Sequence, residues 1–272
     1  MGPSRGDVFA VTMVRDEIDI IESTLRHITG EVDHIIVADN GSTDGTRDIL
    51  ADLTRDLPLT VIDDPDPAYY QSRKMTRLGD MAHEQGAHWV LPCDSDELWL
   101  SDGRVGTDLM SLDASIRVHE VALYNHFPSS IDPPGTNPFV TIRWRQRKPA
   151  TLPKIAVRWA PGTVIHQGNH GVTIPGPRDP SCRRSGLLSI RHFPYRTAEQ
   201  FERKAVNGAA AYNATDLPPE LGSHWRAYGE VHRIHGSEAV QNIFRQHFWY
   251  LSPVDGDLVE DPAPFRRWDL YT

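Results

Sequence analysis

Cysteine is scarce in this sequence. The 272 residues include two, Cys93 and Cys182, which can form neither a disulfide framework nor a cysteine-rich zinc site. Cys93 follows an apolar run at residues 90–92, so we expect it to be a small residue of the core. The sequence therefore excludes a disulfide scaffold and a cysteine-bound zinc domain.

Long apolar runs and a basic excess are also missing. No stretch approaches the roughly 20 apolar residues of a membrane-spanning helix, and no apolar signal sequence opens the chain. The 28 Lys and Arg stand against 37 Asp and Glu, a net charge of −9. This balance argues against a nucleic-acid partner, because phosphate neutralisation needs clustered cations. We expect a soluble, cytoplasmic protein without a transmembrane segment.

The first hundred residues instead alternate between strand and helix patterns. Short apolar runs predict buried strands, and apolar residues at helical spacing between them predict helices. The expected strands are residues 8–14, 34–38, 59–62 and 90–92. Asp16 is the expected N-cap of the first helix and Gly30 its end. This alternation predicts right-handed βαβ units and a mostly parallel sheet.

The pattern changes after Glu97. The sequence then predicts strands near residues 120–126, 140–145, 155–159, 163–166 and 187–192. Residues 197–200, TAEQ, match a capping box that opens a helix, with one or two further helices and an irregular tail from residue 252. We therefore expect an α/β half over residues 8–100, a β-rich half over 101–196, and a helical appendage with its tail over 197–272.

Three predicted strands end in polar, mostly acidic residues: 15–17, 39–44 and 94–97. In a parallel sheet such ends share one edge, where ligands bind. If the strand continues through residues 94–97, Asp94 and Asp96 lie on one face about 7 Å apart. Two carboxylates so placed suit a hard divalent cation, which prefers oxygen ligands and shares them with substrate phosphates.

Several motifs together resemble glycosyltransferase family 2. Residues 37–46, VADNGSTDGT, resemble its signature, and residues 94–97, DSDE, resemble its DxD motif. Residues 154–158, His166 and the block 191–196, RHFPYR, resemble a family-2-like branch with a late His-x-x-x-Arg motif. The resemblance covers roughly residues 8–208.

The resemblance implies an α/β GT-A fold, in which a Rossmann-like, mostly parallel nucleotide-binding sheet is fused to a β-rich acceptor half, here followed by C-terminal helices. It implies a glycosyltransferase that moves a sugar from a nucleoside diphosphate sugar to an acceptor hydroxyl. The reaction would be assisted by Mn²⁺ or Mg²⁺ and would generally invert the sugar. A UDP-sugar is the favoured donor, and a GDP-sugar is the second choice.

The same resemblance implies ligand roles for individual residues. The metal would be held by Asp94, Asp96 and His192. The nucleotide sugar would be contacted by Thr12, Val14, Arg15, Glu17, Asp39, Asn40, Arg73, Asp94, Ser95, Tyr195 and Arg196. In the family the acid at the position of Asp39 contacts the base. Arg73, Tyr195 and Arg196 would hold phosphates, and Glu17 equally suits the dipole of the following helix.

The general base is the open position. An inverting transfer needs a carboxylate or an imidazole that takes the acceptor proton. No acid between the DxD motif and the late histidine stands in a motif typical of the family. The candidates are His166, His170, Asp179 and Glu97. The missing acidic motif leaves inversion itself open.

Two other functions remain as alternatives. A nucleotidyltransferase would need a glycine-rich loop after the first strand, and no glycine occurs between Val14 and Gly30. A non-catalytic sugar-binding module could use the same scaffold, although Asp94, Asp96 and His192 are all present. The acceptor is undefined: a glycan, a lipid-linked glycan or a small molecule. Four tryptophans could stack a sugar: Trp144, Trp159, Trp225 and Trp249.

Overall fold

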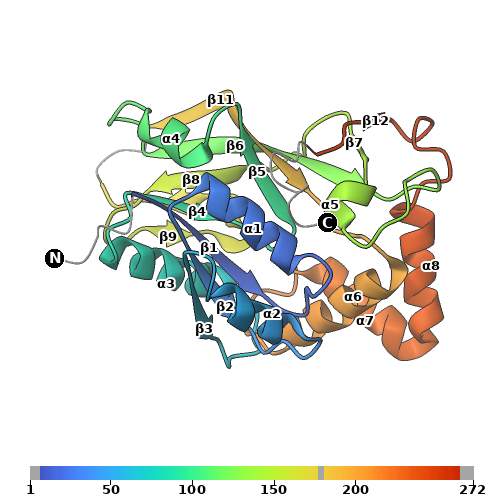
Figure 1. Ribbon diagram of the computed structural model, residues 1–272. Helices are drawn as coiled ribbons and strands as arrows, with labels where there is room; N and C mark the ends of the chain where they lie inside the picture. Colours follow the sequence, from blue (N-terminus) through green and yellow to red (C-terminus); the bar gives the residue numbers. More distant parts are fainter. Residues whose placement is uncertain (1–6, 177–180, 264–272) are drawn as a thin grey trace.

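The structure is a computed structural model that describes residues 7–176 and 181–263 (Figure 1). It is a mixed α/β protein built around one large, curled sheet, with the order β12-β7-β6-β8-β4-β1-β2-β3 and with β11 and β5 joined to it through β6. The expected fold class, a parallel sheet fused to a β-rich half and followed by C-terminal helices, is confirmed. In the described part of the chain no helix is long and apolar enough to cross a membrane.

The parallel part of the sheet comes from the first hundred residues. Its four strands are β1 (Val8–Val14), β2 (His34–Asp39), β3 (Leu59–Asp63) and β4 (Trp89–Pro92), in the order β3-β2-β1-β4. Val14 pairs with Asp39, and Asp39 pairs with Asp63, so the strands end level with one another. The polar segments that follow β1, β2 and β4 therefore meet at one edge, as the sequence predicted.

Helices cover both faces of this sheet because successive strand residues point to opposite sides. Val8 and Ala10 of β1 pack with the face formed by α1 (Ile21–Glu31), α2 (Thr46–Leu53) and α4 (Val105–Met110). Phe9 and Val11 pack on the opposite face against α3 (Gln71–Glu84). The strands are apolar on both sides, which is why they appear as continuous apolar runs in the sequence.

The second half extends the same sheet. Antiparallel pairs join β4 to β8 (Lys154–Arg158), β8 to β6 (Val118–Phe127), β6 to β7 (Trp144–Gln146) and β7 to β12 (Leu258–Glu260). A small separate hairpin is formed by β9 (Val164–Ile165) and β10 (Val172–Thr173), with a 3₁₀ turn at Gln167–Asn169 between them.

One late strand ties the two halves together. β11 (Cys182–His192) runs parallel to β6 and antiparallel to β5 (Glu97–Ser101), and this register sets His192 opposite both Glu97 and Asn125. Just beyond the strand, Phe193 N donates to Asp96 O over 2.9 Å. The late histidine is thereby fixed beside the acidic turn, although almost one hundred residues separate them in the chain.

Four local expectations are corrected by the structure. The strand β4 ends at Pro92, and residues 93–96 form a turn before β5. The first helix begins at Ile21 and runs to Glu31, so neither Asp16 nor Gly30 bounds it. Residues 138–141 of the expected strand 140–145 form a short helix, α5 (Pro138–Thr141), because Asn137 caps Phe139 N and a proline occupies its first position. The tail expected to be irregular contains β12.

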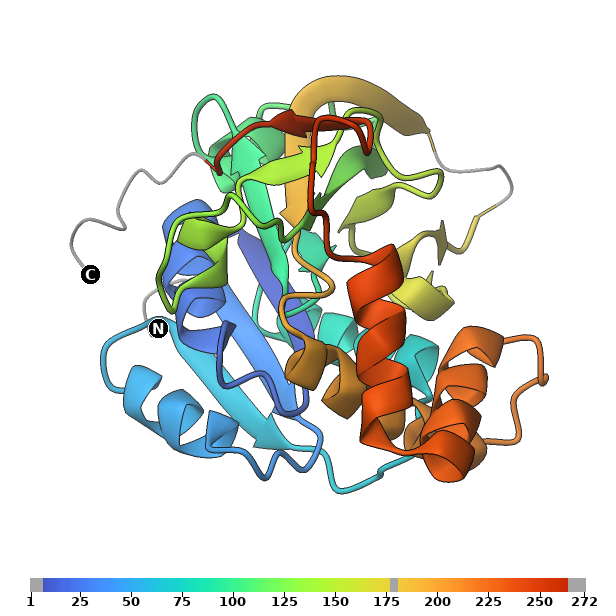
Figure 2. The ribbon, with the colours of Figure 1, turned by 90° about the vertical axis from the view of Figure 1, so that its right-hand side faces the viewer.

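The C-terminal helices pack together on one side of the sheet (Figure 2). They are α6 (Ala198–Asn213), α7 (Ser223–His235) and α8 (Ser237–His247). The predicted helix start is confirmed, since Thr197 Oγ1 accepts from Gln200 N over 3.1 Å. The capping box is only partly formed, because Gln200 Oε1 accepts from Arg196 N rather than from Thr197 N. α7 approaches α6 closely: a Cβ added at Gly229 would lie 2.2 Å from Ala209 Cβ, and one at Gly208 would lie 3.1 Å from the Trp225 ring.

Candidate active site

A cavity of about 630 Å³ opens at the carboxyl ends of the parallel strands. The β1–α1 segment, the 94–96 turn, the end of β11 and helices α6 and α7 all contribute to its wall. Ten residues that the sequence assigned to the site line it: Val14, Arg15, Glu17, Asn40, Asp94, Ser95, Asp96, His170, His192 and Tyr195. Six do not: Thr12, Asp39, Arg73, Glu97, His166 and Arg196. Asp179 lies outside the described residues.

The two acids of the DxD-like turn point to different partners. Asp94 Oδ2 accepts from Lys154 Nζ over 2.5 Å, and its Oδ1 accepts from Asn169 Nδ2 over 3.0 Å. Asp96 Oδ2 accepts from Lys204 Nζ over 2.6 Å. The expectation that both carboxylates share one strand face is therefore wrong, because the strand ends before them and a turn separates their side chains.

Asp96 of the turn also lies beside His192. Asn125 Oδ1 lies 2.7 Å from His192 Nδ1 and, as a carbonyl, can only accept a hydrogen bond there. This bond leaves His192 Nε2 facing Asp96 Oδ1 at 3.4 Å. Two such atoms can contact one ion, and a neighbour that fixes the tautomer is usual for a ligating histidine.

These residues fit a divalent ion as a two-ligand site. In the described residues no group of three or more His, Cys, Asp or Glu side chains is arranged to hold a metal. Mg²⁺-type sites commonly take one or two protein ligands and complete their shell with water and substrate phosphate. Asp96 and His192 could supply those two ligands, whereas Asp94 is already bonded to Lys154 and Asn169. The metal itself stays a prediction.

Asp96 is buried but remains ionised. Burial raises the pKa of its carboxyl group, but Lys204 and His192 lower it more, so that its pKa lies well below the usual range. An ionised, buried carboxylate with neighbouring cations is the kind of group expected at a functional site.

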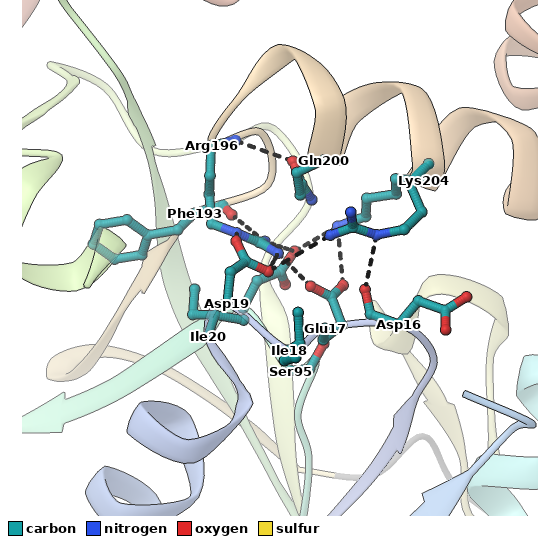
Figure 3. Close-up of polar contacts among 12 residues, drawn as sticks. Asp16, Glu17, Ile18, Asp19, Ile20, Ser95, Phe193, Arg196, Gln200 and Lys204 are labelled. Atoms are coloured by element: carbon teal, nitrogen blue, oxygen red, sulfur yellow. Dashed lines mark hydrogen bonds and ion pairs between the residues drawn. The ribbon is translucent and has the colours of Figure 1, made fainter. Parts of the chain in front are cut away.

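Glu97 and Arg196 stand behind the cavity wall. Glu97 is buried, its Oε2 accepts from Asp94 N over 3.1 Å, and its Oε1 lies 3.1 Å from Lys154 Nζ. Arg196 bonds Glu17 and Asp19 of the β1–α1 segment and donates to Phe193 O over 3.1 Å (Figure 3). Both residues hold the loops that shape the site.

The two candidate histidines are placed differently. His166 lies in the β9–β10 hairpin, where its Nε2 meets Thr173 Oγ1 at 2.9 Å, and it does not reach the cavity. His170 lines the cavity, and its Nδ1 donates to Pro153 O over 2.9 Å. Burial and the nearby Lys154 lower the pKa of His170. Its Nε2 is therefore available as a neutral acceptor at neutral pH.

Other expected nucleotide contacts are partly covered. Asp39 is buried under Arg47, whose Nη1 lies 3.1 Å from its Oδ2. Asn40 reaches the cavity and is fixed by its amide, which donates to Asp66 O over 2.6 Å. Arg73 is 66% exposed and bonds Asp66 Oδ2 at 2.8 Å outside the cavity. The guanidinium that the motif assigned to phosphate thus faces an acidic loop instead.

The sequence reading missed the contribution of the C-terminal helices. Lys204, Asn207, Tyr212 and Trp225 line the cavity from α6 and α7. A signal for the α6 residues exists: Gln200, Lys204 and Asn207 make a polar stripe at helical spacing on a helix whose other face is apolar. Nothing in the local sequence indicates that this stripe faces the acidic turn.

Comparison with known proteins gives one family match. Residues 11–106, about a third of the chain, match the family model described as glycosyl transferase family 2. A search of curated proteins found no match.

Several solved structures show a remote likeness. S. aureus TarS 1–349 is 12% identical, with 84% of this chain and 72% of that chain covered and a TM-score of 0.38. The same protein in complex with UDP-GlcNAc is 14% identical, covering 89% and 76%, with a TM-score of 0.37. GalNAc-T7 with UDP, GalNAc and Mn²⁺ is 11% identical, covering 89% and 58%, with a TM-score of 0.37. Likenesses of this size assign no ligand to the present chain.

Proposed function

We propose that this chain is a family 2-like glycosyltransferase that moves a sugar from a nucleoside diphosphate sugar, by preference a UDP-sugar, to an acceptor hydroxyl. The match of residues 11–106 to the family model supports the proposal. One observation carries the proposal. The acidic turn at the end of β4 and the late His192 converge on a single cavity, with Asp96 Oδ1 and His192 Nε2 3.4 Å apart. In α/β sheets a ligand binds at this edge.

The cavity wall suggests how a donor lies in it. Arg15 and Asn40, at the ends of β1 and β2, would border the nucleoside, and the diphosphate would lie at the acidic turn. A Mn²⁺ or Mg²⁺ ion would be held by Asp96 and His192, and when bound it supplies charge neutralisation for the diphosphate leaving group. Asn125 and Lys204 keep these two side chains in position.

His170 is the proposed general base. Its Nδ1 is committed to Pro153 O, and its Nε2 can take the proton of the acceptor hydroxyl as the oxygen attacks the anomeric carbon. The new carbon–oxygen bond forms while the bond from that carbon to the diphosphate oxygen breaks, and the electron pair leaves with the nucleoside diphosphate. A single displacement of this kind inverts the sugar. Of the four tryptophans considered for an acceptor sugar, Trp225 lines the cavity.

Binding of the donor product tests the proposal directly. Calorimetry of the protein with UDP and with GDP, each in the presence of Mn²⁺, should show saturable binding of at least one. A mass-spectrometric screen of nucleotide sugars would then identify the donor by the nucleotide released. If neither diphosphate binds, the proposal is wrong.

Asp96→Asn gives a second test of the same site. Loss of the carboxylate charge should lower turnover by roughly 10² to 10³, the scale for removing one electrostatic group from a reaction centre. Asp113→Asn is the control, because Asp113 is exposed and lies outside the cavity. Full turnover in Asp96→Asn would contradict the role given to the turn.

A further inference from the structure

Lysine is rare in this chain and concentrated at acids. The four lysines are Lys74, Lys148, Lys154 and Lys204. Lys74 bonds Asp64 at 2.7 Å outside the cavity, and Lys148 is exposed. Lys154 and Lys204 both line the cavity, each on one acid of the turn. These two lysines differ in how much of the side chain is exposed.

Lys154 is a buried, structural cation. Its ammonium group has three N–H donors, and three oxygens lie within 3.1 Å: Asp94 Oδ2, Glu97 Oε1 and Gly168 O. Its side chain is 4% exposed. Its hydrogen bonds to Asp94 and Gly168 join the turn to the 3₁₀ segment, and its buried side chain offers almost no surface to a ligand.

Lys204 is the more exposed of the two lysines. Among the described residues two oxygens lie within hydrogen-bond distance of its Nζ, Asp96 Oδ2 at 2.6 Å and Pro194 O at 3.3 Å. The next acid, Glu17, stands 3.9 Å away. The side chain is 27% exposed and projects from α6 toward the β1–α1 segment (Figure 3). One ammonium donor therefore remains for a group inside the cavity.

We propose that Lys204 binds the diphosphate of the donor directly, as a cation that the chain itself supplies beside Asp96. The inference rests on the proposed function and adds to it a phosphate-binding residue from α6. Lysine binds phosphate as a point charge, and two fixed contacts hold this one in place before the ligand arrives. It stabilises the charge that grows on the diphosphate as the bond to the sugar breaks. Part of the donor affinity therefore persists when divalent ions are removed.

The test compares a nucleoside diphosphate with its own nucleoside. Affinities for UDP and uridine, or GDP and guanosine if guanine is preferred, are measured by calorimetry in EDTA and in Mn²⁺. In EDTA the wild-type protein should bind the diphosphate more tightly than the nucleoside. Lys204→Met should lower the affinity for the diphosphate by roughly 10- to 100-fold, the scale of one charged hydrogen bond. The affinity for the nucleoside should stay unchanged. Lys204→Arg should keep most of the affinity, and the exposed control Lys148→Met should match the wild type.

Each other result has a distinct meaning. If Lys204→Met lowers the affinities for UDP and uridine equally, and Lys204→Arg restores both affinities, then Lys204 only holds the loops in position. This result would overturn the inference. Equal affinities of the wild type for UDP and uridine in EDTA would also overturn it, since the ion would then provide all of the phosphate binding. If the wild type binds neither diphosphate even with Mn²⁺, the proposed function itself fails.

Discussion

Substitution of Arg196 tests most directly whether a residue of the site positions the loops or contacts the ligand. Its side chain is 1% exposed, and its guanidinium bonds both oxygens of Asp19 at 2.7 and 2.9 Å as well as Glu17. We consider Arg196→Met, which keeps the approximate length of the side chain and removes every one of these bonds. The family motif assigns this arginine to phosphate, whereas the structure places it behind the cavity wall.

The expected cost of this substitution is large. Removing one partner of a buried ion pair typically destabilises a protein by about 3–5 kcal/mol, because the other charge stays buried without compensation. Glu17 is buried and Asp19 is partly exposed, so we expect the lower half of that range. For a protein of this size, about 3–4 kcal/mol corresponds to a fall in Tm of roughly 6–16 °C.

Urea and thermal unfolding measure this effect, with Arg55→Met as the control at an exposed arginine. The variant with Glu17→Gln and Asp19→Asn added should recover part of the loss, since the uncompensated charges are gone. At a temperature where Arg196→Met is folded, UDP and uridine affinities should fall together, because in the proposed binding mode the loop it holds borders the nucleoside, which both ligands share. Normal stability with a loss confined to UDP would refute this reasoning and restore the phosphate role.

Two further predictions concern stability. His126 is buried and stacked on Phe193, and burial together with Arg191 lowers its pKa from 6.5 to about 3. The unfolded chain takes up this proton below pH 6.5 and the folded chain does not, so stability should fall by up to about 1.4 kcal/mol per pH unit from pH 6.5 toward 3. His126→Phe should lack this component, and parallel wild-type and variant slopes in urea titrations would contradict it. Gly229→Ala should lower the free energy of unfolding by about 1–3 kcal/mol, because the added Cβ overpacks the α6–α7 contact 2.2 Å from Ala209 Cβ. Adding Ala209→Gly should recover this loss in urea titrations. Additive losses from the two substitutions would show that the close approach is not the cause.

Short-range patterns in the sequence account for the N-terminal half. Apolar runs located β1 to β4 to within one residue at each end, and helical spacing predicted the helices between them, because both periodicities report the same buried sheet. The polar ends of these strands placed the site, since parallel strands share one edge. Thr197 marked the start of α6, because a cap is a local hydrogen bond between residues three apart.

Element boundaries that depend on contacts with distant residues could not be predicted from the local sequence. Asp16 was expected to cap α1, yet its carboxylate binds Thr43 N at 2.7 Å and Asn207 Nδ2 at 2.7 Å. The acids at positions 94 and 96 were expected on one strand face, yet each is drawn to a different lysine. A short polar segment has no periodicity of its own, so its conformation follows whichever distant groups satisfy its charges.

The sequence by itself determined the α/β class, the parallel sheet and the edge at which the cavity opens. Only the tertiary structure decided which side chains meet there: β11 brings His192 to Asp96, α6 brings Lys204, and Arg196 is kept for the loop behind them. The physical reason is the separation along the chain of the residues that interact. Hydrophobic periodicity is written into neighbouring residues, whereas the pairing of buried charges depends on strand register and helix docking between segments about one hundred residues apart.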